Sequence, residues 1–153
     1  MFRDEMTLAE ARDQLRDLVD EGATCPCCRQ YARVYRRKIH ATMARTLCRV
    51  YRAAPSGEWV HLPSLAGYQV NDFPKLRYWG LVEEEIELRR DDGGRAGYWR
   101  ITPQGWQWVL IWTTVPKYAR IYDGRCLGLE GDPVTVLDAL GDRFDYRELM
   151  EGE

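Results

Sequence analysis

The spacing of apolar residues along the chain predicts three amphipathic helices. Apolar side chains recur at helical spacing over residues 8–21, and Thr7 with Glu10 matches a capping box, in which side chains and backbone at a helix start satisfy each other's hydrogen bonds. A second apolar stripe runs over residues 41–54, and a further apolar-rich helix is expected after Pro103, because proline is well tolerated in a first helical turn.

Short runs of β-branched and aromatic residues predict strands between and after these helices. Glycine-containing turns separate the runs, and Gly80 closes a short helix. The expected elements are a basic strand at 31–39, a strand at 59–62, a helical turn at 63–68, a short helix at 73–79, a hairpin formed by 81–88 and 98–102, a second hairpin over 118–129 centred on Asp123-Gly124, a short helix at 136–140 and a terminal turn at 146–150.

Length and composition predict one globular unit with a small appendage. The chain has 153 residues, 45% of them hydrophobic, which is enough to bury a core and too few for two large domains. Its longest apolar stretch is far too short to cross a bilayer, and the first residues lack the pattern of a signal peptide. We therefore expect a cytoplasmic protein with no membrane partner, divided into an N-terminal part (1–40), a central domain (41–115) and a C-terminal hairpin with an acidic tail (116–153).

The order of elements over residues 41–115 is that of a winged helix-turn-helix domain. The segments "KLRYWGLVE" and "GYWRITPQG" resemble the second half of such domains, where a helix-to-strand junction leads into the wing and the returning strand opens the next helix. The whole chain also resembles small phage-encoded proteins that join a "CPxC" knuckle to this module and end in a "FDYRELM" tail. The resemblance implies an α+β fold, a winged helix-turn-helix with an N-terminal helix, a cysteine knuckle and a C-terminal hairpin and helix extension. It implies DNA binding, although many winged helices serve protein contacts instead.

Charge is distributed unevenly along the chain. The formal net charge is −2, yet residues 29–54 contain eight Lys and Arg and no Asp or Glu. Such a segment suits phosphate contacts, and Tyr31 and Tyr35 within it suit stacking on unpaired bases. The alternative is a solvated surface that balances the acidic first helix and tail. The candidate nucleic-acid contacts are Arg29, Arg33, Arg36, Arg37, Lys38, Arg45 and Arg49 in this segment, Lys75, Arg77 and Tyr78 in the expected recognition helix, and Arg89 and Arg90 in the wing.

The five cysteines favour a metal site or free thiols over disulfides, because their number is odd and three of them fall within four positions. The stretch Cys25-Pro26-Cys27-Cys28-Arg29 resembles the "CPxCG" knuckle of zinc ribbons, with Arg29 in place of glycine. Structural Zn²⁺ takes four ligands, and no second CxxC is present. The expected set is Cys25 and Cys28, completed by Cys27 and His40, and the alternative is free thiols in a turn that holds no metal. Cys48 falls beside the apolar stripe of its helix and is expected to be buried.

Three tryptophans surround more than one face of the helix after Pro103. Trp106, Trp108 and Trp112 therefore predict burial against the domain and against a second surface, either a homodimer partner or the C-terminal hairpin and tail. No paired carboxylates, phosphate loop or catalytic triad is apparent, so we do not expect an enzyme. The leading hypothesis is a DNA-binding accessory or transcription-regulatory protein, acting in the host cytoplasm if phage-encoded. The alternative is a protein–protein interaction module, of host-takeover or anti-defence type, that uses the winged helix as a scaffold.

Overall fold

A computed structural model describes residues 5–65, 67–69, 72–88, 91, 93–94 and 96–152. The helices are α1 (Leu8–Leu18), α2 (Ala41–Ala53), α3 (Pro103–Val109) and α4 (Val136–Leu140), with 3-10 helices η1 (Leu62–Ser64) and η2 (Phe73–Trp79) and a terminal π-helix η3 (Glu148–Gly152). The strands are β1 (Ala23–Thr24), β2 (Tyr31–Ala32), β3 (Tyr35–Lys38), β4 (Val60–His61), β5 (Val82–Glu84), β6 (Tyr98–Ile101), β7 (Val115–Tyr122) and β8 (Arg125–Val134). They form three small antiparallel sheets, so the expected α+β class is confirmed.

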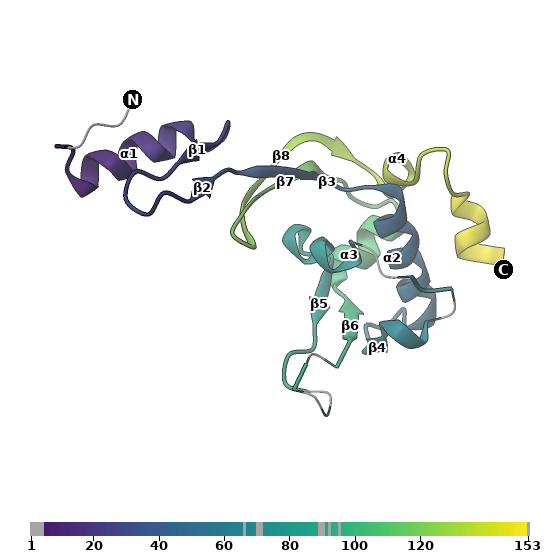
Figure 1. Cartoon of the computed structure of the whole chain (residues 1–153). Coiled ribbons are helices and arrows are strands. Elements are labelled where there is room, and N and C mark those ends of the chain that lie inside the picture. The colour runs from purple at the N-terminus through teal and green to yellow at the C-terminus, as the bar shows by residue number, and fades with distance from the viewer. Residues whose placement is uncertain are drawn as a thin grey trace.

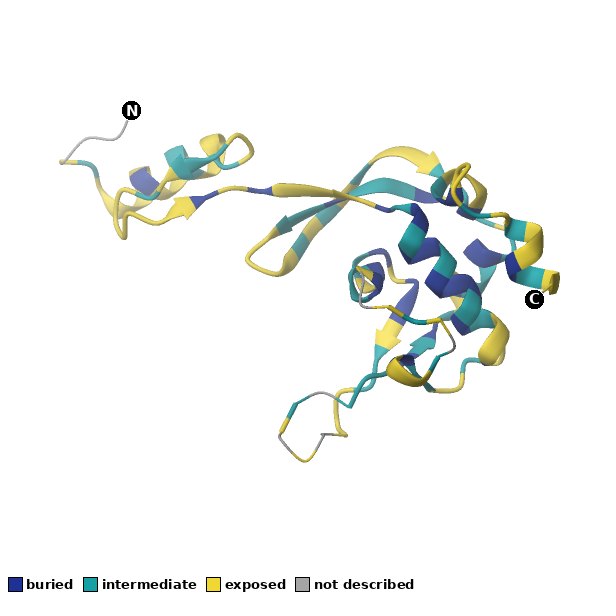
Figure 2. Cartoon of the chain, turned by 45° about the vertical axis from the view of Figure 1, so that its right-hand side comes forward, coloured by how far each residue is buried: buried dark blue, intermediate teal, exposed yellow. Residues whose placement is uncertain are grey.

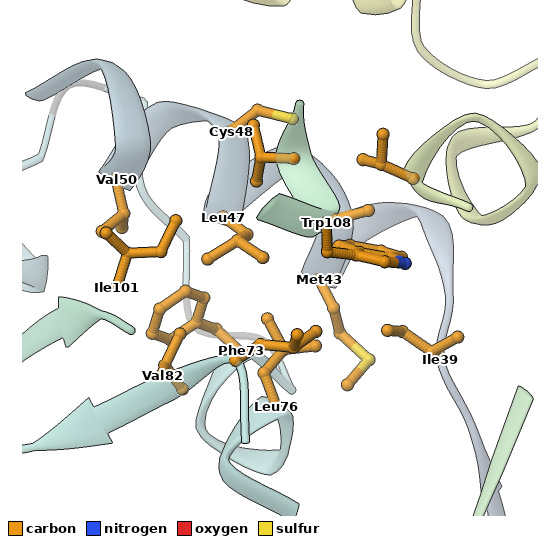
Figure 3. Packing of buried hydrophobic residues seen from close by; sticks show 14 of the residues in the cluster. Ile39, Met43, Leu47, Cys48, Val50, Phe73, Leu76, Val82, Ile101 and Trp108 are labelled. Carbon is orange, nitrogen blue, oxygen red and sulfur yellow. The ribbon is translucent and has the colours of Figure 1, made fainter. Parts of the chain in front are cut away.

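The main core lies around α2, which packs against α3, α4, η2, η3 and β6 (Figure 1). Leu47 on α2, Phe73 on η2 and Trp108 on α3 are fully buried and belong to one hydrophobic cluster (Figure 3). Cys48 has 0% exposure in the same cluster, which confirms its predicted burial. Burial raises the pKa of the Cys48 thiol to about 12, because the low-polarity surroundings disfavour the thiolate.

The C-terminal hairpin of β7 and β8 is longer than predicted. Its two-residue turn is confirmed: Asp123 and Gly124 have φ angles of 51° and 73°, as a type I′ turn requires. Strand β3 adds to the other edge of β7, which gives the sheet order β3-β7-β8. A second sheet has the order β4-β6-β5, and β5 and β6 are its antiparallel hairpin neighbours.

An appendage made of α1, β1 and β2 projects from the body, and β3 connects it to α2 (Figures 1 and 2). The capping box at Thr7 and Glu10 is confirmed. The helix ends at Leu18 rather than at residue 21, and Gly22 follows with a φ of 101°. A side chain at Gly22 would also collide with the hydroxyl end of Tyr31 on β2, so this glycine leaves room for the Tyr31 side chain.

Several element boundaries differ from the prediction for local reasons. The expected strand 31–39 is divided into β2 and β3, which belong to different sheets, because the Val34 N–H donates to the Val19 carbonyl at 2.9 Å instead of to a strand partner. The expected strand 81–88 stops at Glu84. The carboxylate of Glu85 accepts the N–H groups of Glu87 and Leu88, both at 2.8 Å, and turns the chain there. Of the helices that the structure describes, none is long and apolar enough to cross a membrane.

Candidate nucleic-acid interface

Strand β3 presents an exposed row of polar and aromatic side chains at a sheet edge. All four residues from Tyr35 to Lys38 are exposed, and the strand hydrogen-bonds only to β7 within its sheet. Because side chains alternate across a strand, Tyr35 and Arg37 lie on one face and Arg36 and Lys38 on the other. The two faces carry different chemistry.

On the first face, the Tyr35 ring lies near two guanidinium groups, one from Arg37 of β3 and one from Arg33, which precedes the strand. The guanidinium carbons of Arg33 and Arg37 lie 5.6 and 5.4 Å from the centroid of the Tyr35 ring, within the range of cation–π attraction. Tyr35 is 46% exposed. Among the described residues, no carboxylate forms an ion pair with Arg33 or Arg37. We call Arg33, Tyr35 and Arg37 the arginine–tyrosine row; it offers two positive charges and one flat apolar surface to solvent.

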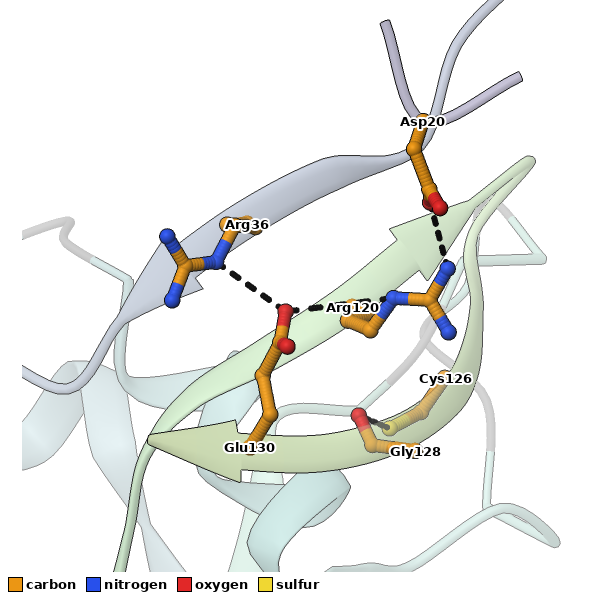
Figure 4. A network of polar contacts seen from close by, with 6 residues as sticks. All are labelled: Asp20, Arg36, Arg120, Cys126, Gly128 and Glu130. Atoms are coloured by element: carbon orange, nitrogen blue, oxygen red, sulfur yellow. Dashed lines mark hydrogen bonds and ion pairs between the residues drawn. The ribbon is translucent and has the colours of Figure 1, made fainter. Parts of the chain in front are cut away.

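The opposite face carries arginines that are neutralised by carboxylates (Figure 4). Arg36 donates from Nε to Glu130 Oε1 at 3.0 Å, and its guanidinium lies 4.1 Å from the centroid of the Tyr118 ring. Arg120 pairs with Asp20 and, at 3.8 Å, with Glu130. The hydrogen bond with Asp20 holds the pKa of Arg120 above its usual range. Two cations and two carboxylates thus join the end of α1 to the sheet, and Arg36 is less suited to phosphate than the sequence predicts.

The arginines of α2 are directed toward the protein's own chain. Arg49 donates to the Gly67 carbonyl at 3.3 Å, and Arg52 donates to the Leu149 carbonyl at 3.2 Å. The guanidinium of Arg45 lies 4.8 Å from the centroid of the Phe144 ring. The basic flank of α2 therefore contacts the C-terminal segment and the loop after η1, and it does not continue the arginine–tyrosine row.

The expected recognition helix, η2, is held against the turn of the β7–β8 hairpin. Tyr78 donates from its hydroxyl to the Gly124 carbonyl at 2.9 Å, and the Trp79 Nε1–H donates to the Pro116 carbonyl at 2.7 Å. Lys75 pairs with Asp72 at 2.7 Å. This hydrogen bond is the main reason why the pKa of Asp72 is lowered. Arg77 donates to the Tyr78 hydroxyl and to the carbonyl of the third residue before it. Arg89 and Arg90, predicted for the wing, lie outside the described residues.

The structure separates the predicted metal ligands. Cys25, Cys27, Cys28 and Arg29 lie in the turn between β1 and β2, whereas His40 precedes α2 and its Nε2 lies 3.1 Å from Asp72. Hydrogen bonds, above all from the Cys28 backbone N–H, lower the pKa of Cys25. In the described part of the chain, no three His, Cys, Asp or Glu side chains are grouped to hold a metal ion, and a zinc site completed by His40 stays a prediction.

The three tryptophans of the α3 region have different environments. Trp108 is fully buried and donates from Nε1 to the Val134 carbonyl at 3.0 Å, so the C-terminal hairpin covers it. Trp106 is partly buried and lies edge-on to Trp112, with ring centroids 5.3 Å apart. Trp112 is 67% exposed. For Trp108, the second surface is therefore the C-terminal hairpin. For Trp112, burial against a homodimer partner stays a prediction.

Basic residues outside the predicted set also lie near β3. A cleft of about 310 Å³ at the start of α2 is lined by Lys38, Lys117 and Arg143 together with Asp138 and Asp142. Lys117 and Arg120 belong to β7, and they lie near β3 because β7 pairs with β3. Because that pairing is distant in sequence, no local pattern predicts it.

No family model, curated protein or solved structure matches this chain. Arguments about its function therefore depend on the arrangement of its own residues.

Proposed function

We propose that this protein binds DNA, as an accessory or regulatory protein, through the arginine–tyrosine row on β3. One observation carries the proposal: the exposed ring of Tyr35 lies near the guanidinium groups of Arg33 and Arg37, which have no carboxylate partner among the described residues. Guanidinium groups bind phosphate oxygens, and an exposed aromatic ring stacks on an unpaired base. A phosphate–base–phosphate arrangement along a single strand therefore matches the row, and the ring adds a preference for unpaired bases.

We further propose that a winged helix-turn-helix is the scaffold. The order of α2, η1, η2, the β5–β6 hairpin and α3 supports it, as does the addition of β4 to β6 in one sheet. In this proposal, η2 contributes less than a usual recognition helix, since the hydrogen bonds of Tyr78 and Trp79 hold it against the β7–β8 hairpin. The main contact lies instead along β3.

The test is fluorescence anisotropy of the full chain with labelled single-stranded and duplex DNA of random sequence, titrated across salt. The double variant Arg33→Gln/Arg37→Gln removes both charges of the row. Each lost phosphate contact lowers the slope of log affinity against log salt by about 0.7 on a single strand, so we expect the double variant to lose about 1.4 of that slope.

The matched control is Arg16→Gln/Arg147→Gln. These arginines have highly exposed side chains, 74% and 84%, on α1 and near the C-terminus, so the net charge changes equally while the row is intact. We expect the control to bind DNA with nearly the slope of the unchanged protein. An equal loss in both double variants would reduce the effect to general charge and contradict a site at β3.

An apolar groove favours the interaction module as the second candidate. It has a volume of about 320 Å³ between α1 and the β7–β8 hairpin, and its apolar lining comes from Leu15, Val19, Val34, Tyr122 and Leu127. Absence of DNA binding even at low salt would favour this candidate. A photocrosslinker placed at Leu127, which is 51% exposed, would then identify a protein partner.

A further inference from the structure

The cysteine turn lies at the tip of the appendage. Figure 1 shows that the connection between β1 and β2 lies toward the end of the appendage that points away from α2, near the start of α1. The turn is closed by two backbone hydrogen bonds: the Cys25 N–H donates to the Gln30 carbonyl at 2.7 Å, and the Arg29 N–H donates to the Cys25 carbonyl at 2.8 Å. Cys27 and Cys28 are exposed, and Cys25 is partly exposed. The thiols are therefore accessible to a ligand or to another protein molecule.

The turn has the local geometry of a two-thiolate metal knuckle. The Arg29 N–H bond to the Cys25 carbonyl closes the turn directly after Cys28, so Cys25 and Cys28 lie in one tight turn. Cys25 and Cys28 have the CxxC spacing with which two thiolates bind one Zn²⁺ ion. Arg29 has a φ of 64°, the left-handed conformation that the residue after such a pair adopts and that usually favours glycine.

One chain, however, supplies only half of a structural zinc site. Structural Zn²⁺ is held by four ligands in a tetrahedron. His40 is hydrogen-bonded to Asp72, Cys48 has 0% exposure in the core, and Cys126 donates to the Gly128 carbonyl at 3.5 Å. Within the ranges that the structure describes, no third ligand joins the turn. A second pair of thiolates from another molecule would complete the tetrahedron.

We propose that two copies of the chain share one Zn²⁺ ion, held by Cys25 and Cys28 of each copy. Four thiols bind as thiolates and release four protons to solvent, with no change of oxidation state. The resulting centre carries a net charge of −2, and Arg29, which follows Cys28 in the sequence of each copy, supplies a positive charge next to the ligands. A two-fold axis through the metal is the simplest symmetry for such a pair, and the position at the tip keeps the two bodies apart.

The weak packing of the appendage gives the metal a structural role. Only Ala11 is buried on α1, and β1 and β2 have two residues each. So small a unit usually needs a metal or a disulfide to hold its conformation. The shared ion would also join two arginine–tyrosine rows in one assembly, although the zinc site itself is independent of DNA binding.

The test combines zinc content and molar mass of the full chain under reducing conditions. Protein loaded with Zn²⁺ and freed of excess metal is analysed by elemental analysis and by size-exclusion chromatography with light scattering. We expect one zinc per two chains and the mass of a dimer, conversion to monomer on chelation, and recovery of the dimer when Zn²⁺ alone is returned. This reversible arm uses unchanged protein, so it does not depend on whether a variant folds.

Variants then assign the ligands. Cys25→Ser and Cys28→Ser should each lose both zinc and the dimer, whereas Cys27→Ser, the matched control in the same turn, should keep both. Cobalt in place of zinc should give the visible spectrum of a tetrahedral four-thiolate site. One zinc per chain on a monomer, a dimer that survives chelation, or zinc retained by Cys28→Ser would each overturn the shared site.

Discussion

Replacing Gly105 with alanine sets two physical effects of opposite sign against each other. Gly105 lies within α3, where alanine is intrinsically better than glycine by about 1 kcal/mol. A Cβ added there would lie 2.1 Å from the Leu81 carbonyl oxygen and 2.7 Å from the Ile101 Cγ1. Propensity alone therefore predicts a stabilised protein, and packing predicts the reverse.

The structure indicates that packing prevails. The obstructing atom at 2.1 Å is backbone and cannot rotate away, so α3 or the segment before β5 would have to move by about 0.9 Å to restore a 3.0 Å contact. Thr102 resists that movement: its hydroxyl donates to the Gly80 carbonyl at 2.6 Å and accepts the Gly105 N–H at 3.0 Å. Overpacking a rigid site costs about 3 kcal/mol, and movement of α3 would also disturb buried Trp108. After the propensity gain we expect a net loss of about 2 kcal/mol.

Thermal and urea unfolding followed by circular dichroism measure this loss. For a chain of this size, 2 kcal/mol corresponds to a fall in Tm of about 4–8 °C. Gly124→Ala is the matched control, because Gly124 has a φ of 73° but nothing within 4 Å of an added Cβ, so it reports backbone strain without collision, at about 1 kcal/mol. If Gly105→Ala is as stable as the unchanged protein, the close approach of α3 to the chain before β5 is wrong.

Two further predictions concern the core and the attachment of η2. At pH 8, iodoacetamide should modify Cys27 and Cys28 in metal-free protein but leave Cys48 unmodified until urea is added, as mass spectrometry would show. Burial raises the pKa of Cys48 to about 12. The stability that the neutral, buried Cys48 thiol contributes is therefore complete below about pH 8.5 and is lost as the pH rises toward 12. Trp79→Phe should lower the free energy of unfolding by about 2 kcal/mol in urea titrations, because the Pro116 carbonyl loses its 2.7 Å hydrogen bond; no change would mean that η2 is not anchored there.

The elements that depend on neighbouring residues could be predicted from the sequence. The capping box at Thr7 and Glu10, the type I′ turn at Asp123-Gly124 and the left-handed Gly80 after η2 each depend on contacts within a few residues. The amphipathic stripe of α2 likewise predicted its buried face, including Cys48. For the candidate site, the sequence shows Tyr35 within the basic segment 29–54, and the approach of Arg33 and Arg37 to its ring is seen in the structure.

The partners of the basic side chains could not be predicted in this way. Arg36 meets Glu130, 94 positions along the chain, and Arg52 meets the Leu149 carbonyl, 97 positions along. Such pairings follow from the register of β3 on β7 and from the path of the C-terminal segment, and neither leaves a local pattern. A count of eight cations in residues 29–54 therefore overstates the charge that is available to a ligand.

The β7–β8 hairpin determines where the arginine–tyrosine row lies relative to the rest of the protein. It pairs with β3 along one edge, bonds through its turn to Tyr78 of η2, and binds the end of α1 through the Arg120–Asp20 ion pair. These contacts fix the arginine–tyrosine row relative to η2. A DNA strand that follows β3 would consequently meet the hairpin turn before it reached η2, because the turn covers the Tyr78 side of that helix. In the proposed DNA complex, residues beside β3 would therefore make the contacts with the strand, and η2 would support the hairpin turn.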